Sequence, residues 1–452
     1  MQNTFYKSLI QNFGHQPTKN QLTVIGELTD FVFLKIEKHL FVLKGYAGTG
    51  KTSLVGALVK TLPIINFDSV LLAPTGRAAK VLSNYANKPA FTIHKMIYQL
   101  QSGGDGFTRF VIKQNKFQNT IFLVDEASMI GDGGGLSSQQ WGESKSLLDD
   151  LLEFVYDGVN CKLILIGDTA QLPPVGMELS PALDEDFLYT SYHLNIEFNE
   201  LSEVVRQATD SEILINATYL RNKIALINND LPLFNSVNKA DVKTISGLEL
   251  EDQLTDAYGK FGDDNVMLIT RSNKRANLFN LQIRARIKWL EDEIATGDYM
   301  MVVKNNYFWL TDDAKAGFIA NGDIIEILRI TGYEELYGFR FVNVTARMID
   351  YPNEPDLEVK ILMDSMLTES PSLPSDKFRE LYDAISEDYA DESNRKKRNE
   401  LIRKNPYYQA LQVKFAYAIT CHKSQGGQWD AVFVDQGYLT DEMINVEYLR
   451  WL

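Results

Sequence analysis

The residues with the clearest chemical meaning form the octapeptide GYAGTGKT at 45–52, between an apolar run that ends at Lys44 and the helix-like stretch TSLVGALVKTL. Glycines let a backbone wrap around a triphosphate, so that its N–H groups and the following helix N-terminus face the anion. Lys51 can then reach the β- and γ-phosphates, and the Thr52 hydroxyl can bind Mg²⁺. This context favours a nucleotide-binding loop over a chance glycine-rich turn. The predicted nucleotide ligands are Gly45, Ala47, Gly48, Thr49, Gly50, Lys51, Thr52 and Ser53.

Two adjacent carboxylates form a second signal, Asp125 and Glu126, directly after the apolar run 121–124. Parallel sheets bind ligands at the carboxyl ends of their strands, so this pair is expected beside the loop at 45–52. We expect Asp125 to hold Mg²⁺ through water and Glu126 to polarise the water that attacks a phosphate. The alternative is a solvated acidic pair at a strand end. Next to the loop, phosphoryl transfer with ATP and Mg²⁺ as cofactors is the better interpretation.

Short apolar runs alternate with amphipathic stretches from about residue 15 to residue 205, and these elements must position the chemical groups. Most runs end in a polar or glycine-rich turn and precede a helical period, which is typical of buried parallel strands with crossover helices. Two segments interrupt the pattern: 95–120 is expected to form a β-hairpin, and 131–146 a Gly/Ser-rich loop. The predicted strands are 40–44, 70–73, 121–124 and 162–166.

The second half of the chain predicts another α/β unit that carries an insertion. This unit begins at 266–269, continues with a basic amphipathic helix at 273–288, and returns at 416–435. Between these parts, 298–365 alternates apolar and polar residues, which indicates a small antiparallel barrel. A charged helical segment follows at 375–408. The basic helix could line a channel or be a solvated face.

Composition sets wider limits on the class of protein. The chain has 452 residues, 45% hydrophobic and 23% charged, which excludes wholesale disorder and fibrous repeats. Its two cysteines, Cys161 and Cys421, exclude a disulfide scaffold or a cysteine-rich zinc site and predict a reducing, cytoplasmic location. No apolar stretch is long enough to span a membrane. The net charge of −15 argues only weakly against nucleic acid, because a local basic channel is compatible with it.

Further motifs narrow the class of nucleotide hydrolase. They are APTGRAAK at 73–80, FTIHK at 91–95, GDTAQLPPVG at 167–176, LSEVVRQ at 201–207 and AYAITCHKSQG at 416–426. Together with the loop and the acidic pair, they resemble the ordered motifs of superfamily 1 DNA helicases over residues 16–435. The nearest branch is the RecD-like, 5′-to-3′ type, which includes exodeoxyribonuclease V alpha chains and the phage Dda helicase.

This resemblance implies an α/β fold of two RecA-like P-loop NTPase domains, with a small β-hairpin insertion in the first and a β-barrel-like insertion in the second. The first domain would occupy 1–205, with its hairpin at 95–120, and 206–297 would form the linker and the start of the second domain. Residues 298–408 would form the barrel-like and helical insertion, and 409–452 the truncated remainder of the second domain.

The resemblance also assigns roles in the nucleotide site. Gln21 would read the adenine edge, although a surface glutamine fits that residue type equally well. Gln171 would sense the γ-phosphate from a loop that Asp168 orders. Arg206 would be an arginine finger that stabilises transition-state charge, with an ordinary surface arginine as the alternative. Gly426 would also bind the nucleotide. The catalytic set is Lys51, Asp125, Glu126, Gln171 and Arg206.

Two similar segments, Thr-Ile-His-Lys at 92–95 and Thr-Cys-His-Lys at 420–423, occur in the two predicted α/β domains. Hydroxyl, imidazole and ammonium groups can all donate to phosphates and so position a strand without reading its sequence. A single histidine is more often a core or surface residue, and the repetition of the pattern favours the DNA contact. The predicted DNA ligands are Pro74, Thr75, Arg77, Thr92, His94, Lys95, Thr420, His422, Lys423 and Ser424.

The resemblance implies an ATP-dependent DNA helicase that translocates 5′-to-3′ on single-stranded DNA and unwinds duplex, with duplex junctions as partners. The hairpin could act as a strand-separating wedge, and the barrel could dock a protein partner. One alternative is a DNA-stimulated ATPase or translocase without strong unwinding. Another is a nucleotide-switched DNA-repair interaction protein, which would need neither Glu126 nor Arg206.

The last segment departs from the family pattern. A final motif resembling Y-x-A-x-T-R, with a second arginine for the γ-phosphate, is expected after the helix-like stretch 441–452. We expect a longer native chain, because an end at this position would leave an unpaired sheet edge and an uncovered apolar helix face. The alternative is a natural terminus in a protein that uses Arg206 alone.

Overall fold

The first α/β unit is built on a six-stranded sheet in the order β3-β2-β6-β7-β1-β8, with every neighbouring pair parallel. The computed structural model describes residues 1–451 apart from 103–107, 134–145, 204–210, 227–229, 235, 237–240, 311–313, 315–317, 352–353 and 438–445. The strands are β1 His39–Gly45, β2 Asp68–Ala73, β3 Ala90–Thr92, β6 Thr120–Val124, β7 Lys162–Gly167 and β8 Asn195–Leu201. The four predicted strands are therefore confirmed as β1, β2, β6 and β7. The sequence did not reveal the edge strand β8, because most of its residues are only partly buried.

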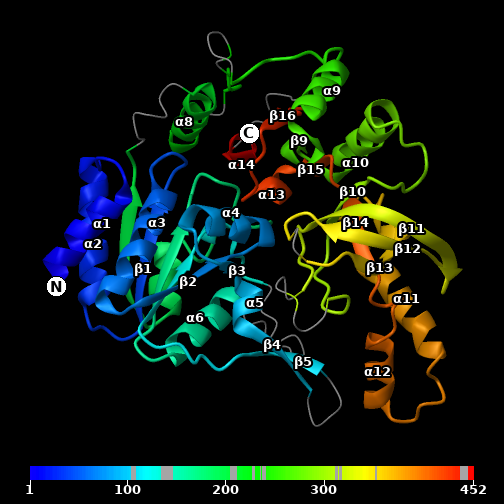
Figure 1. Ribbon diagram of the computed structural model, residues 1–452, viewed down its shortest axis with the longest axis horizontal. Helices are drawn as coiled ribbons and strands as arrows, with labels where there is room; N and C mark the ends of the chain where they lie inside the picture. The colour runs from blue at the N-terminus through cyan, green and yellow to red at the C-terminus, as the bar shows by residue number, and fades with distance from the viewer. Residues whose placement is uncertain are drawn as a thin grey trace.

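Helices cover both faces of this sheet (Figure 1). Alternate strand residues point to opposite faces: Phe41 and Leu43 pack with α1 to α4, whereas Leu40 and Val42 pack with α5 to α7. The predicted hairpin is also present, as β4 Tyr98–Ser102 paired with β5 Thr108–Ile112. The helices are α1 Gln2–Phe13, α2 Lys19–Phe33, α3 Lys51–Thr61, α4 Gly76–Ala86, α5 Ile93–Ile97, α6 Leu147–Asp157 and α7 Glu185–Ser191.

The second α/β unit has a parallel sheet in the order β15-β9-β16. Its elements are α9 Leu250–Phe261, β9 Val266–Thr270, α10 Asn273–Gln282, β15 Ala418–Thr420, α13 Cys421–Ser424, β16 Ala431–Val434 and α14 Val446–Trp451, and α8 Glu212–Ala225 precedes it. Among the described residues, no helix combines the length and apolar character needed to cross a bilayer.

The predicted barrel is present as the closed sheet β10-β11-β12-β13-β14, at the right of Figure 1. The prediction that it is antiparallel throughout is wrong, because β13 and β14 pair in parallel. Its last strand, β14, lies outside the predicted barrel segment 298–365 and beyond the predicted end of the insertion at 408, because β14 pairs with both β10 and β13. The helices α11 and α12 cover one end of the barrel. The elements are β10 Tyr299–Val302, β11 Ile324–Leu336, β12 Phe339–Met348, β13 Leu357–Leu362, α11 Ser375–Glu387, α12 Arg395–Arg403 and β14 Leu411–Phe415.

The apolar face of α14 is covered, contrary to the expectation of an exposed face. Tyr448, Leu449 and Trp451 pack with Leu172 of the first unit and Leu220 of α8. Figure 1 shows α14 (red) between α8 and α13. The sequence could not reveal this cover, because α8 and Leu172 lie far away along the chain.

The basic helix at 273–288 is not a uniformly solvated face, and its role as a channel wall stays a prediction. Arg275 pairs with Asp435, and Lys288 pairs with Asp263. Arg284 is 3% exposed and binds Asp298 through two bonds of 2.7 and 2.8 Å.

Loss of the buried Arg284–Asp298 pair should strongly destabilise the second unit. In Arg284→Met the Asp298 carboxylate stays buried and loses the hydrogen bonds from the guanidinium. The side-chain donor that remains is the Tyr417 hydroxyl, 3.1 Å away. The expected loss is about 3–5 kcal/mol in the free energy of unfolding, measured by chemical denaturation. The control Arg286→Met removes an exposed pair with Glu251 and should cost less than about 1 kcal/mol. Equal losses in the two variants would contradict this prediction.

Candidate functional site

The glycine-rich loop joins β1 to α3 in the backbone conformation that its glycines predict. Gly48 has φ 77° and Gly50 has φ 94°, in the left-handed region that glycine adopts most readily. Lys51 is the first residue of α3, and its Nζ donates to the carbonyls of Gly45 at 2.5 Å and Tyr46 at 3.0 Å. Thr52 is half-buried and Ser53 exposed in the same first turn. The loop therefore presents the start of α3, the anion-binding end of a helix.

Side chains from two other elements fix the loop. Asp168, just after β7, accepts from the N–H of Ala47 at 3.1 Å and from the N–H of Ala170 at 2.8 Å. The same carboxylate thus orders its own loop, as expected, and ties that loop to the one at 45–52. Thr49 also helps to hold the loop in place, because its side chain is fully buried and its hydroxyl donates to the Tyr46 carbonyl.

Gln21 has a structural role in addition to the one predicted for it. It is 2% exposed, and its Nε2 donates to the Thr49 carbonyl at 2.8 Å. Its Oε1 accepts from the N–H of Thr18 at 2.9 Å, which completes the capping box of α2. The side chain therefore braces the loop from behind. Its contact with adenine stays a prediction.

The acidic pair lies at the carboxyl end of β6, in the sheet position that the sequence predicts. The N–H of Glu126 donates to Asp125 Oδ1 at 2.9 Å. Burial raises the pKa of both carboxyl groups, and for Glu126 burial and the neighbouring Asp125 charge raise the pKa to about 7. The Lys51 charge acts in the opposite direction on both groups. A carboxylate with a pKa near neutrality is suited to general-base catalysis.

Gln171 joins this group from the loop after β7. Its Oε1 accepts from the Ser128 hydroxyl at 3.1 Å, and a hydrogen bond from its side chain lowers the pKa of Glu126. The structure therefore brings together Lys51, Asp125, Glu126 and Gln171 from three different strand ends. Arg206, the predicted arginine finger, lies outside the described residues.

Two residues that sequence reasoning missed lie beside the phosphate loop. The ring of Tyr46 belongs to the loop itself, and the guanidinium of Arg221 on α8 lies over that ring, 4.8 Å from its centroid. The position of Tyr46 inside the glycine-rich motif was an available signal. Arg221 gave no signal, since only the packing of α8 brings it to the loop.

The first predicted DNA cluster lies at the start of α4 and α5. The hydroxyls of Thr75 and Thr92 cap these helices by accepting from backbone N–H groups. Lys95 is half-buried, and burial lowers its pKa, whereas Asp323 and Glu354 of the barrel region act in the opposite direction. Pro74 and His94 lie in the same two segments. This cluster therefore borders the barrel.

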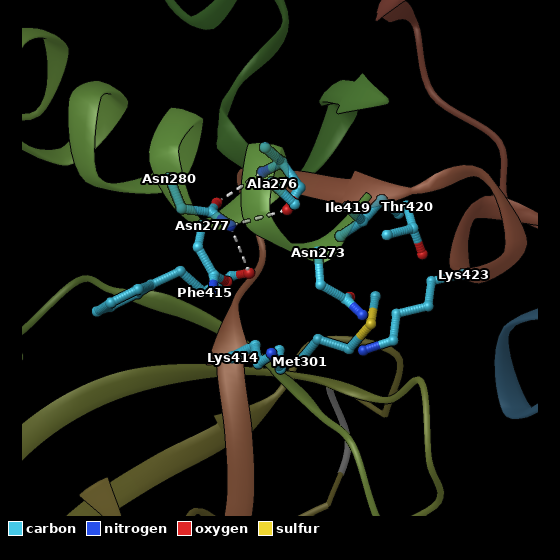
Figure 2. A pocket seen from close by; sticks show the side chains of 11 residues that line it. Asn273, Ala276, Asn277, Asn280, Met301, Lys414, Phe415, Ile419, Thr420 and Lys423 are labelled. Carbon is cyan, nitrogen blue, oxygen red and sulfur yellow. Dashed lines mark hydrogen bonds between the residues drawn. The ribbon is translucent and has the colours of Figure 1, made fainter. Parts of the chain in front are cut away.

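The second predicted DNA cluster borders the barrel as well, at a small pocket between α10, β14 and β15. Figure 2 shows Lys423 and Asn273 extending toward Met301 across this pocket. Lys414 also lines the pocket. Burial lowers the pKa of both Lys414 and Lys423 to about 8. Thr420 is a further lining residue, whereas the Ser424 hydroxyl donates to the Cys421 carbonyl of its own helix. His422 belongs to the same short helix.

Contacts between the two α/β units lie next to these clusters. The Arg77 guanidinium lies over the ring of Trp429, 4.2 Å from the ring centroid. Burial lowers the pKa of Arg77. Gly426 faces α4 so closely that an added Cβ would lie 2.8 Å from Ala78 Cβ. The Gln425 side chain donates to the Leu172 carbonyl at 2.7 Å, next to Gln171. Gly426 is therefore found at the interface between the units, and its contact with the nucleotide stays a prediction.

The predicted Mg²⁺ ligands fit their task. The described residues contain no group of three or more His, Cys, Asp or Glu side chains that could hold a metal ion. A nucleotide-bound Mg²⁺ needs no such cage, because phosphates and water supply most of its oxygen ligands. The half-buried hydroxyl of Thr52 and the carboxylate of Asp125 offer the hard oxygen donors that it prefers.

Comparison with known families agrees with this geometry. Residues 31–225 match the family described as an AAA domain, and residues 415–452 match the family described as a UvrD-like helicase C-terminal domain. These matches contain the loop, the acidic pair and the last motif in the expected order. Together the two matches support the predicted class, a superfamily 1 helicase that hydrolyses ATP.

The similar proteins include helicases. An uncharacterised protein of Acanthamoeba polyphaga mimivirus is 23% identical over 92% of this chain and 93% of its own length. The ATP-dependent RecD2 DNA helicase of Deinococcus radiodurans is 33% identical, and the ATP-dependent DNA helicase dda of Enterobacteria phage T4 is 29% identical. Those alignments cover 30% and 42% of this chain but only 16% and 39% of the two helicases. The structural alignment with a Pif1 helicase from Bacteroides covers 97% of this chain and 90% of the Pif1 chain, at 14% sequence identity and a TM-score of 0.44.

The raised pKa of Glu126 predicts a pH dependence of ATP hydrolysis. A general base works only when deprotonated, so kcat/KM for ATP should rise as the pH increases through about 7. The measurement is a pH profile between 5.5 and 8.5, roughly one and a half units on either side of that pKa. Glu126→Gln should lower kcat by about 10²–10⁴-fold and flatten the profile. A midpoint near the ordinary glutamate pKa would contradict the role of this environment.

Proposed function

We propose that the protein is an ATP-dependent DNA helicase that moves 5′-to-3′ along single-stranded DNA and unwinds duplex DNA. The observation that carries this proposal is the convergence of Lys51, the acidic pair and Gln171 at one sheet edge, next to interdomain contacts. Motif segments predicted to bind DNA lie on both α/β units and border the same barrel. Such an arrangement can link a change at the nucleotide to movement of a strand.

In this proposal, ATP binds with its phosphates against the loop and the start of α3. Lys51 leaves the carbonyls of Gly45 and Tyr46 to neutralise the terminal phosphates. Glu126 orients the attacking water and accepts its proton. Thr52 and Asp125 would hold Mg²⁺, which neutralises charge between the β- and γ-phosphates when bound.

The Gln171 loop is the proposed link between hydrolysis and movement. Gln171 faces the acidic pair, and the next residue, Leu172, accepts a hydrogen bond from Gln425 of the second unit. A shift of this loop after hydrolysis would therefore act on the segment that carries Thr420 to Ser424. The two units would then change their separation while each holds the DNA backbone.

The remaining parts of the proposal concern partners and location. Duplex junctions would meet the hairpin β4–β5, and a protein partner on the barrel remains a prediction from the sequence. A cytoplasmic location is supported by Cys161 and Cys421, which are both free thiols.

ATP turnover with and without single-stranded DNA tests the core of the proposal. The wild type should show DNA-stimulated turnover, and Lys51→Ala should lower it by more than about 10²-fold, because the phosphates lose their main cation. Lys116→Ala, a change outside the predicted sites, is the control and should behave like the wild type. Stimulated turnover without unwinding would favour a translocase, and ATP binding without turnover would favour a nucleotide-switched protein.

Tailed duplexes test the direction of movement. The protein should separate a duplex with a 5′ single-stranded tail much faster than one with a 3′ tail of the same sequence and length. The measurement is release of a labelled strand in the presence of ATP, and a blunt duplex is the control. Preference for the 3′ tail would contradict the proposed direction.

Salt dependence tests the proposed phosphate contact at the pocket in Figure 2. Lys423→Ala should weaken single-stranded DNA binding and reduce the slope of log K against log salt by about 0.7, the value for one phosphate contact. Lys397→Ala on α12 removes a lysine that pairs with Glu392 and should leave the slope unchanged. An unchanged slope in Lys423→Ala would remove this lysine from the DNA site.

A further inference from the structure

The tyrosine in the phosphate loop makes an aromatic contact with a distant helix. Tyr46 occupies the second position of GYAGTGKT, and Arg221 of α8 lies over its ring with Cζ 4.8 Å from the centroid. A guanidinium within about 6 Å of an aromatic face is attracted by the negative charge of that face. The pair therefore joins the loop to α8 directly.

Arg221 is held in this orientation by its own helix. Its Nε donates to the Ala217 carbonyl at 3.2 Å, and its Nη2 donates to the Thr218 hydroxyl at 2.6 Å. Arg221 is partly buried, and burial lowers its pKa, whereas the charge of Asp168 acts in the opposite direction. Because Asp168 also fixes the loop, Arg221 belongs to the electrostatic surroundings of the nucleotide site.

Tyr46 connects this contact to the catalytic lysine. Its carbonyl accepts from Lys51 Nζ at 3.0 Å and from the Thr49 hydroxyl at 2.7 Å. A displacement of the Tyr46 ring would move this carbonyl and so the lysine that has to meet the phosphates. Arg221 can therefore act on the nucleotide without touching it.

The neighbouring residue on α8 faces the second α/β unit. Leu220 is 7% exposed and packs in one apolar cluster with Leu172, Leu449 and Trp451. The Trp451 carbonyl in turn accepts from the Cys421 thiol at 3.1 Å, within the predicted DNA motif. Consecutive residues of α8 thus contact the phosphate loop on one side and the second unit on the other.

We propose that Arg221 is a positioning residue of the nucleotide site, which acts through Tyr46, and that α8 links the phosphate loop to the second unit. Loss of the pair loosens the loop and weakens nucleotide binding. It also reduces the stimulation of turnover by DNA, and this second effect rests on the proposed helicase function. A cation–π pair of ordinary strength corresponds to about a two- to thirtyfold change in affinity.

The experiment compares ATP affinity, KM and kcat in a double-mutant cycle of Arg221→Met and Tyr46→Leu. Each single variant should weaken ATP binding and raise KM by about two- to thirtyfold, and the double variant should be no weaker than either. Arg221→Lys should recover part of the affinity, because it restores a cation at this position. Arg379→Met, which removes an exposed arginine of α11, is the matched control.

The affinity for a non-hydrolysable analogue of ATP is measured by calorimetry in the absence of DNA. This result therefore does not depend on helicase activity. Unchanged affinity in Arg221→Met, or fully additive losses in the double variant, would overturn the proposal. A lower thermal unfolding midpoint with unchanged affinity would also overturn it, because that outcome describes a purely structural residue. Absence of DNA stimulation in the wild type would instead refute the helicase function.

Discussion

The backbone shape of the loop from Gly45 to Gly50 is the constraint on which the rest of the site depends. A loop that must offer several N–H groups to one anion loses conformational entropy unless other contacts already hold it. Here Asp168 holds it on one side and the Gln21 amide holds it on the other. These anchors come from the loop after β7 and from α2. The parallel sheet and its covering helices therefore set the geometry of phosphate binding.

The same sheet edge explains the chemistry of the acidic pair. Partial burial disfavours the charged carboxylates, which is why the pKa of Glu126 rises to about 7. Buried acids of this kind cost stability and are characteristic of functional sites. Lys51 and the Gln171 side chain partly offset the cost at Glu126. A group positioned in this way can exchange a proton near neutral pH, whereas a solvated glutamate would stay charged.

Contacts between the two α/β units coincide with the motifs predicted to bind nucleotide and DNA. Arg77 contacts Trp429, Gln425 contacts the loop of Gln171, and Lys80 pairs with Asp350 beside the barrel at 3.0 Å. Single polar and aromatic contacts can break and form again at lower cost than a continuous apolar core. These contacts are therefore suited to change between states, whereas the apolar cluster of Leu172 with Leu449 and Trp451 holds the units together on the side of α14.

The sequence alone predicted the phosphate loop, several strands and the positions of the acidic pair, because glycine conformation, alternating burial and strand-end carboxylates are local properties of the chain. It predicted β1, β2, β6 and β7, the hairpin and the barrel, and it put Asp125 and Glu126 at the correct edge. Only the tertiary structure decided that Gln21 braces the loop, that β14 closes the barrel, and that Arg221 lies over Tyr46. Those features join residues that are far apart in the sequence, and no local pattern encodes which distant surface will cover a side chain.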